Sequence, residues 1–261
     1  MKPNINPPTP VLAFHKVDPS FEWGVTRTTP GQFRRILARL KADGYGGTSL
    51  QTLLDGSPRN GKRVVLTFDD AYESVYIHAL PLLKAFGFTA TVFVITRYAG
   101  MWNAWDVNLG WLRFRHMSWN QIRELGRLGF EIGSHTVHHA DLTKLNDARL
   151  TDELKRSKED IEQNTGVPAR VVSFPFGRYD QRVVQASREA GYEAACGFLA
   201  WKRKEDPFVY QRKACYLVDG LWNLKAKIGS GWTASLENAK LRFINFCSHG
   251  TSLVKPPRWE D

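Results

Sequence analysis

Cysteine is scarce in this chain: three of the 261 residues are cysteines, and their spacing does not match a metal-binding motif. They are Cys196, Cys215 and Cys247. An odd number allows one disulfide at most, and a free cysteine is commonly a buried thiol. This composition excludes a small disulfide-stabilised scaffold and favours a reducing compartment.

Long apolar runs are also missing. No stretch approaches the ~18 consecutive apolar residues of a membrane-spanning helix. The first apolar segment, residues 11–14, is too short for the core of a signal peptide and is followed directly by His15. As written, the sequence predicts a cytoplasmic protein. An association with the cell envelope would require a leader that the sequence as written does not include.

Acidic residues are in the minority, with 26 Asp and Glu against 36 Lys and Arg, so the formal net charge is +10. This charge favours acidic partners such as anionic glycans, anionic glycolipids or a membrane surface. Solubility alone is the other explanation, because the basic residues are scattered. The chain has no nucleic-acid motif, so we expect no nucleic-acid partner. Nothing in the sequence indicates the oligomeric state.

The chain has no internal repeat, low-complexity tract or linker, so we expect one domain over residues 1–261. Strand-like runs alternate with helical patterns, which is typical of a parallel sheet covered by helices. Capping signals at Thr29 and Ser118 predict two of the helices. The others are expected near residues 73–86, 146–164 and 180–190. The predicted strands lie near residues 10–15, 63–68, 89–95, 129–134, 170–175, 193–196 and 208–214.

Two adjacent carboxylates, Asp69 and Asp70, follow the apolar run at residues 64–68. Such a run predicts a buried strand whose C-terminal end carries both carboxylates, where α/β enzymes place their chemistry. Because successive strand residues point in opposite directions, one carboxylate can bind a cation while the other stays unligated as a base. Taken alone, an Asp-Asp pair at a strand end is more often a turn or a helix N-cap.

A second cluster, Ser134-His135-Thr136-Val137-His138-His139, offers imidazoles. The i, i+4 spacing of His135 and His139 predicts that both lie on one face of a helical turn and can bind Zn²⁺. Taken alone, this spacing more often has another explanation, but its presence beside two carboxylates favours a metal site. His138 points away from that face, so we expect it to support the ligands without binding the metal, or to have a structural role.

These residues carry a family resemblance. Residues 67–70 resemble the first motif of the polysaccharide deacetylases (carbohydrate esterase family 4, the NodB-homology domain), and residues 135–142 resemble the second. The opening residues 11–17 are similar to the circularly permuted branch that acts on poly-N-acetylglucosamine. Further segments occur in family order, so that the likeness covers about residues 10–215. They are residues 70–76, 90–94, 116–119 and 174–177.

The resemblance implies a distorted (β/α)7 barrel. Beyond the segments that carry it, the helical spacing of residues 235–247 indicates a helical C-terminal extension over residues 216–261. The resemblance also implies that a divalent metal is bound by Asp70, His135 and His139. Zn²⁺ is the first choice for two imidazoles and a carboxylate, and Co²⁺ or Ni²⁺ would suit the same ligands. Asp69 would be the general base.

For the oxyanion, the resemblance implies the backbone N–H of Phe176, which follows Pro175. Tyr72 would line the substrate site. Trp102 and Trp105, in an aromatic insertion after the third predicted barrel strand, could stack on sugar faces, although the insertion could equally pack on its own indole rings.

Two histidines are candidates for the general acid. His15 ends the first predicted strand, at the position where the permuted branch carries its acid. His249 superficially resembles a late family motif, but residues 235–247 have helical spacing, so His249 is expected in a last helical turn. We therefore assign the acid to His15. Because an amine anion leaves poorly, the acid is expected to be protonated before amide cleavage.

The sequence departs from the family pattern at several positions. Ser173 stands where many relatives carry an arginine that orients the catalytic Asp, and Ala71 stands where many have glycine, a change that we expect to have little effect. No late Asp-Trp pair is present to orient the acid histidine. The sequence thus predicts a metal-dependent N-deacetylase of an N-acetylated sugar, with an O-acetyl esterase or an inactive carbohydrate-binding domain as alternatives.

Overall fold

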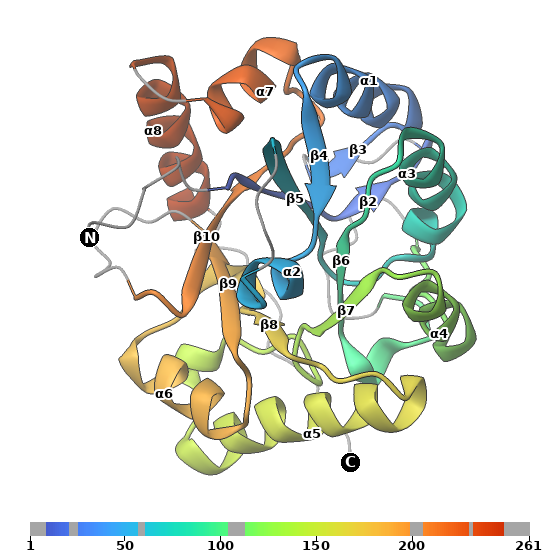
Figure 1. Cartoon of the computed structure of the whole chain (residues 1–261). Helices are drawn as coiled ribbons and strands as arrows, with labels where there is room; N and C mark the ends of the chain where they lie inside the picture. The colour runs from blue at the N-terminus through green and yellow to red at the C-terminus, as the bar shows by residue number, and fades with distance from the viewer. Residues whose placement is uncertain are drawn as a thin grey trace.

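The structure, a computed structural model, describes residues 9–20, 26–56, 61–103, 113–198, 206–229 and 232–247. Within these ranges seven parallel strands close into a barrel (Figure 1). The first strand in the chain closes it by pairing with two others, because Leu12 lies opposite both Leu66 and Lys213. In barrel order the strands are β1 (Val11–Phe14), β10 (Val209–Ala214), β9 (Ala194–Phe198), β8 (Val171–Ser173), β7 (Glu131–Ser134), β6 (Thr91–Val94) and β5 (Lys62–Phe68).

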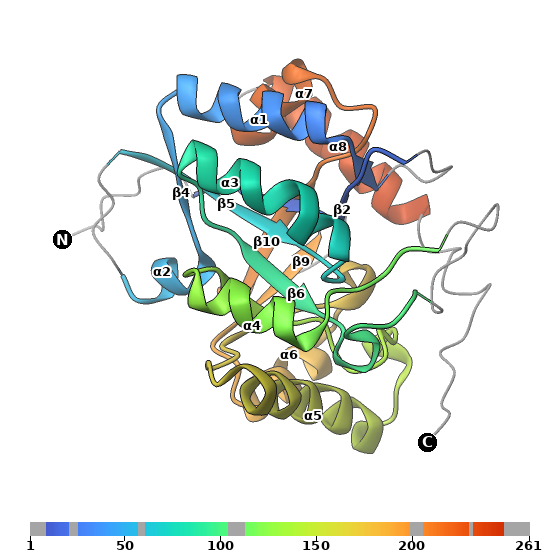
Figure 2. The same ribbon diagram turned by 90° about the vertical axis from the view of Figure 1, so that its right-hand side faces the viewer.

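All seven barrel strands fall where the apolar runs predict them, and the (β/α)7 barrel is confirmed. The outer layer consists of the predicted helices (Figures 1 and 2). Their bounds are α1 (Pro30–Ala42), a π-helical turn Val75–Ala79 that continues into α3 (Leu80–Phe86), α4 (Trp119–Arg127), α5 (Asp147–Thr165) and α6 (Gln181–Glu189). Three short 3₁₀ segments lie in loops, at Thr96–Tyr98, Leu142–Lys144 and Pro175–Gly177.

Both predicted helix caps are present. The Thr29 side chain accepts a hydrogen bond from the backbone N–H of Gln32, and Ser118 forms a reciprocal capping box with Gln121. The core between α1 and the barrel contains three mutually packed rings, with centroids 5.3 to 5.7 Å apart, contributed by Phe14, Phe33 and Phe68. Two of these rings end β1 and β5, so this packing fixes the strands that deliver His15 and Asp69.

Three further strands were not expected from the sequence. The strand β4 (Tyr45–Thr48) pairs with the start of β5, outside the closed barrel, and β2 (Lys16–Val17) pairs with β3 (Arg27–Thr28) in a separate small sheet. The short helix α2 (Leu50–Leu54) follows β4. Its first backbone N–H groups, on Leu50 and Gln51, donate to the buried Glu131 carboxylate at the start of β7. This cap places α2 at the end of the barrel opposite the carboxyl ends of the strands.

After the barrel come α7 (Leu221–Ile228) and α8 (Trp232–Cys247), so the predicted C-terminal extension is helical over these ranges. The buried Lys227 of α7 forms an ion pair with Glu237 of α8, which joins the two helices, and another with Asp219, just before α7. Cys196 and Cys215 are buried free thiols, as expected. His249 lies outside the described residues. Over the part of the chain that is described, no helix has the length and apolar character needed to span a membrane.

Candidate metal and catalytic site

Asp69 follows β5 directly, and its backbone N–H donates to the carbonyl oxygen of Phe14 at 2.9 Å. Its buried carboxylate forms a two-pronged ion pair with Arg212 of β10, in which Nη1 donates to Oδ1 at 2.6 Å and Nη2 to Oδ2 at 2.8 Å. The Ser173 hydroxyl accepts from Arg212 at 2.8 Å and lies 3.3 Å from Asp69 Oδ1. Burial alone would raise the pKa of Asp69, but Arg212 and His135 together hold it well below its usual range. Asp69 is therefore ionised at neutral pH.

Sequence reasoning missed Arg212. The arginine expected at position 173 is replaced by serine, yet a guanidinium still contacts the carboxylate because β10 supplies one from another strand. The available signal was a charged residue in the middle of a predicted barrel strand. Its partner, however, lies 143 positions away in the chain.

Asp70, His135 and His139 come together in the fold. One ligand atom of each lies within 4.8 Å of the others, and all three residues are buried. Asp70 Oδ1 is 3.4 Å from His135 Nε2 and 3.7 Å from His139 Nε2. The predicted ligand set is thus assembled without Asp69, whose carboxylate is held by Arg212.

The chemistry of these three groups fits a divalent cation. Burial lowers the pKa of His135, and burial together with His135 lowers that of His139 well below its ordinary value. The Nδ1 of His135 lies 2.7 Å from the carbonyl oxygen of Ser173, which can only accept, so Nδ1 carries the proton. The Nε2 lone pair then faces a carboxylate oxygen. A metal ion between these two electron-pair donors would remove their repulsion.

The i, i+4 spacing of His135 and His139 does not place them on one face of a helical turn, so that prediction is wrong. The two residues are in a loop, not on a helical turn, and Thr136 and His139 have φ of +66° and +58°. Short contacts fix this loop: the N–H of Thr136 donates to Ser134 Oγ, and the N–H of His139 donates to Thr136 Oγ1, both at 3.1 Å. The imidazoles converge because the chain folds back at left-handed residues.

Glu153 of α5 contacts the backbone of the loop at residues 135–139. This buried carboxylate accepts from the backbone N–H groups of Val137 and His138 at 2.9 and 3.0 Å. It also contacts His138 Nδ1 at 2.6 Å. The His138 ring is therefore directed at α5 and not at Asp70, in agreement with the structural role expected for it.

His15 lies between β1 and β2, at the carboxyl end of β1. Phe14 and Phe68 are register partners in β1 and β5, so His15 and Asp69, which directly follow them, leave neighbouring strands at the same end of the barrel. Burial lowers the pKa of His15 to about 4, with only a partial offset from Asp69. His15 is consequently neutral at pH 7 in the free site. This state differs from the protonated imidazole that amide cleavage was expected to require.

The expected substrate-contacting residues have different surroundings. Phe176 belongs to the Pro175–Gly177 turn, has φ of +58°, and packs its ring on His139 with centroids 4.7 Å apart. Tyr72 is 1% exposed and stacks on His116, so its ring is a packing element, and the geometry gives no support for a substrate contact. Trp102 is 53% exposed and available to a ligand. Trp105 lies outside the described residues.

Left-handed backbone is concentrated at this site. Among the described residues, the non-glycine positions with positive φ are Asp70, Ala71, Thr136, His139 and Phe176. Such conformations cost roughly 1–3 kcal/mol each and persist where surrounding contacts enforce them. Ala71, at +49°, belongs to this set and lies in a strained turn beside a proposed metal ligand.

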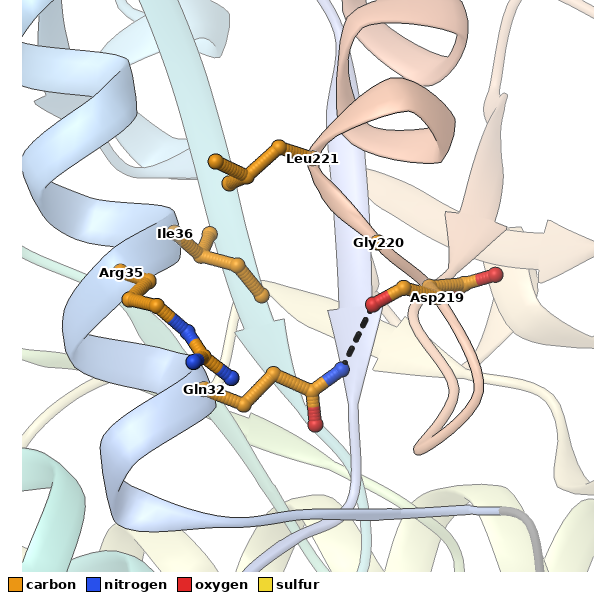
Figure 3. A pocket seen from close by; sticks show the side chains of 6 residues that line it. All are labelled: Gln32, Arg35, Ile36, Asp219, Gly220 and Leu221. Atoms are coloured by element: carbon orange, nitrogen blue, oxygen red, sulfur yellow. Dashed lines mark hydrogen bonds between the residues drawn. The ribbon is translucent and has the colours of Figure 1, made fainter.

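A cavity of about 240 Å³ lies elsewhere, between α1 and the start of α7 (Figure 3). The Gln32 amide donates there to the carbonyl oxygens of Tyr216, Leu217 and Asp219. None of the proposed site residues lines this space. We attribute it to the joint between the C-terminal helices and the barrel. Its lining consists of Gln32, Arg35, Ile36, Asp219, Gly220 and Leu221.

The sequence profile of one protein family, described as polysaccharide deacetylase, matches residues 56–195. This range makes up more than half of the chain. It contains both adjacent carboxylates and the three proposed metal ligands. His15 and Arg212 lie outside it.

Curated relatives agree with this match. YxkH of Bacillus subtilis (strain 168), which carries a provisional polysaccharide deacetylase name, is 28% identical over 189 residues, covering 70% of this chain and 62% of YxkH. A poly-beta-1,6-N-acetyl-D-glucosamine N-deacetylase of Staphylococcus aureus (strain NCTC 8325 / PS 47) is 24% identical over 139 residues, covering 50% of this chain and 46% of the relative. The chain thus spans less than two-thirds of the length of these relatives.

Solved structures support the same barrel. The Streptococcus pyogenes deacetylase PplD, in complex with acetate, superposes with a TM-score of 0.74 at 22% identity, covering 85% of this chain and 98% of PplD. IcaB from Ammonifex degensii gives a TM-score of 0.66 at 26% identity, covering 81% of this chain and 91% of IcaB. The first of these likenesses concerns the fold alone.

Proposed function

The chain belongs to the polysaccharide deacetylase family, and from this premise we propose that it is a metal-dependent hydrolase that removes N-acetyl groups from an amino sugar in a polysaccharide. One observation carries the proposal. Asp70, His135 and His139 converge as a ligand set, while the adjacent Asp69 is held apart, ionised, by Arg212. Metal-assisted hydrolysis of an acetamide uses these two parts, a metal site that polarises the carbonyl and a separate base that accepts the proton of water.

Asp70, His135 and His139 would hold the metal, with Zn²⁺ as first choice and Co²⁺ or Ni²⁺ as alternatives for the same donors. A bound divalent ion would supply Lewis acidity, polarising the acetamide carbonyl and lowering the pKa of water. Asp69 accepts the proton of the attacking water, since it is ionised and its orientation is fixed by Arg212. The backbone N–H of Phe176 stabilises the oxyanion.

His15 delivers a proton to the departing amine. Because its pKa in the free site is about 4, it begins the cycle neutral and gains its proton after Asp69 has removed one from water. The electrostatic interaction between Asp69 and His15 supports this transfer, since a proton on His15 is favoured by a nearby carboxylate. The products are acetate and a free amino sugar.

The named S. aureus relatives suggest the substrate class, a β-1,6-linked polymer of N-acetylglucosamine. The test is acetate release from N-acetylglucosamine oligomers of this linkage, lipid-linked N-acetylated sugars and an acetylated xylan, with the metal content measured in parallel. We expect release from N-acetylated substrates that stops on chelation and returns with added Zn²⁺ or Co²⁺. Release from the xylan alone would indicate an esterase. Metal-independent sugar binding without acetate release would indicate a binding domain.

A further inference from the structure

One segment outside the family's two core motifs contacts the turn that carries Asp70. Residues 115–117 run antiparallel to residues 71–73, and Tyr72 and His116 form a backbone bridge. The N–H of Met117 donates to the carbonyl oxygen of Ala71 at 2.8 Å, and the N–H of Glu73 donates to that of Arg115, also at 2.8 Å. The turn is thus bound to this segment on its C-terminal side.

The side chain of His116 adds a contact to Asp70 itself. Its Nδ1 lies 2.6 Å from the Asp70 carbonyl oxygen, and the imidazole is 1% exposed. A carbonyl oxygen can only accept, so Nδ1 carries the proton and donates it. The ring stacks on Tyr72, with centroids 4.8 Å apart and an interplanar angle of 19°. Stacking therefore fixes the plane of the imidazole, and the hydrogen bond fixes the peptide that follows Asp70.

The conformation of Asp70 explains why such a contact matters. With φ of +69°, Asp70 is in the left-handed region, and Ala71 follows at +49°. Two consecutive non-glycine residues in that region are strained, and relaxation of the peptide between them would swing the Asp70 carboxylate relative to the imidazoles. The hydrogen bond from His116 ends on the oxygen of that peptide. It opposes this rotation while Asp70 Oδ1 stays 3.4 Å from His135 Nε2.

We propose that His116 is a positioning residue for the metal site, which holds Asp70 in its ligating conformation through the hydrogen bond from Nδ1 to the Asp70 carbonyl oxygen. This inference rests on the proposed function, because it takes Asp70 as a metal ligand. It adds a residue that lies on a different segment from every proposed ligand and holds one of them by its backbone carbonyl oxygen.

The test compares metal affinity in variants of the full chain, with Zn²⁺ titrated against a chromophoric chelator. His116→Phe keeps a ring that can stack on Tyr72 but removes the donor. His116→Asn restores a donor, because its side-chain amide nitrogen is the same number of bonds from the backbone as Nδ1. Outer partners of metal ligands typically contribute 10- to 100-fold in affinity. We expect His116→Phe to weaken Zn²⁺ binding by about that factor and His116→Asn to recover most of it.

Leu125→Ala is the matched control for a general loss of stability. Leu125 is a buried side chain of α4 that is absent from the metal cluster, so its truncation should lower Tm and leave the Zn²⁺ affinity unchanged. If the His116→Phe chain does not fold, His116→Gln replaces it, because its amide lies one bond farther from the backbone and cannot donate from the Nδ1 position.

Wild-type affinity in the donor-free variant, or no recovery in His116→Asn, would overturn the positioning role alone. If the wild-type chain binds no Zn²⁺, Co²⁺ or Ni²⁺, both the proposed metal site and the proposed role of His116 are contradicted.

Discussion

Asp69 and Asp70 are joined by one peptide bond, yet their carboxylates have different partners. Asp69 receives two hydrogen bonds from Arg212, whereas Asp70 faces two imidazole nitrogens. The sequence predicts a division of roles from strand alternation, but that reason is wrong, because both residues follow the end of β5 and Asp70 lies in a left-handed turn. It does not predict Arg212, because a contact between residues 143 positions apart depends on barrel closure and has no local pattern.

Replacing Arg212 should change the pH dependence of the reaction. In the wild type, Arg212 opposes the effect of burial and keeps the pKa of Asp69 low, so protonation of Asp69 does not limit the rate near neutral pH. In Arg212→Gln, burial acts without a full counter-charge and raises the pKa of Asp69. The acidic limb of kcat/KM should move to higher pH, as measured in a pH–rate profile.

Arg212→Lys is the matched control, since it keeps the charge and loses the two-pronged geometry; the acidic limb of its kcat/KM profile should move less.

The ion pair between Arg212 and Asp69 also contributes to stability. A carboxylate whose pKa is lowered by folding stabilises the fold above its unfolded pKa of about 4, and this contribution is lost as the pH falls toward the folded value. An unchanged acidic limb in Arg212→Gln would mean that Arg212 does not control the protonation of Asp69.

At the scale of elements, the strands were predictable and the loops were not. Each barrel strand is a short apolar run between turn signals, and the burial of both faces makes that pattern strong. The strand β4, with the sequence Tyr-Gly-Gly-Thr, has little apolar character, and α2 is only five residues long, so neither gives a clear period. The i, i+4 spacing wrongly predicted a helical turn at residues 135–139. Spacing in the sequence carries no information about the positive φ of Thr136 and His139, which shapes this loop.

The contact between α5 and that loop gives a prediction at this scale. Glu153→Ala removes the acceptor for two backbone N–H groups and for His138 Nδ1. Buried donors without an acceptor cost ~1–3 kcal/mol each, so the two backbone N–H groups alone should lower the free energy of unfolding by about 2–6 kcal/mol, and the Zn²⁺ affinity should fall as the loop relaxes. Urea unfolding and a metal titration measure these effects.

The matched control for Glu153→Ala is His138→Ala, which removes one of the three donors and none of the proposed ligands. It should retain metal and activity, with a smaller loss of stability. A normal Zn²⁺ affinity in Glu153→Ala would show that α5 does not hold the ligand loop in place.

For the whole molecule, closure of the barrel brings residues from distant segments to one end. The strand β1 pairs with both β5 and β10, and this closure sets His15 beside Asp69 and Arg212. We expect His15→Ala to abolish amide cleavage while sparing metal binding and much of any activity on esters with good leaving groups. His249→Ala should reduce stability only modestly. Loss of deacetylation in a folded, metal-loaded His249→Ala chain, with activity kept in His15→Ala, would reverse the assignment.

The ligands come from two loops of the barrel, so metal binding should stabilise the whole fold. At a free metal concentration 100 times Kd, the linkage amounts to about 2.7 kcal/mol, and Tm should rise by roughly 5–10 °C for a chain of this size. The rise should shrink as the pH falls, because the imidazoles must be neutral to bind metal. Differential scanning calorimetry with and without Zn²⁺ measures it, and Tm values that are unaffected by metal would count against the site.

Asp70 and Asp69 are proposed to have separate roles, with Asp70 as a metal ligand and Asp69 as the general base. The most direct test is the metal content of Asp69→Asn and Asp70→Asn, measured side by side on folded protein together with kcat. We expect Asp69→Asn to keep about one ion per chain while kcat falls by roughly 10²–10⁴. Asp70→Asn should lose both the metal and the activity. A metal-free Asp69→Asn chain beside a fully loaded Asp70→Asn chain would contradict these assignments.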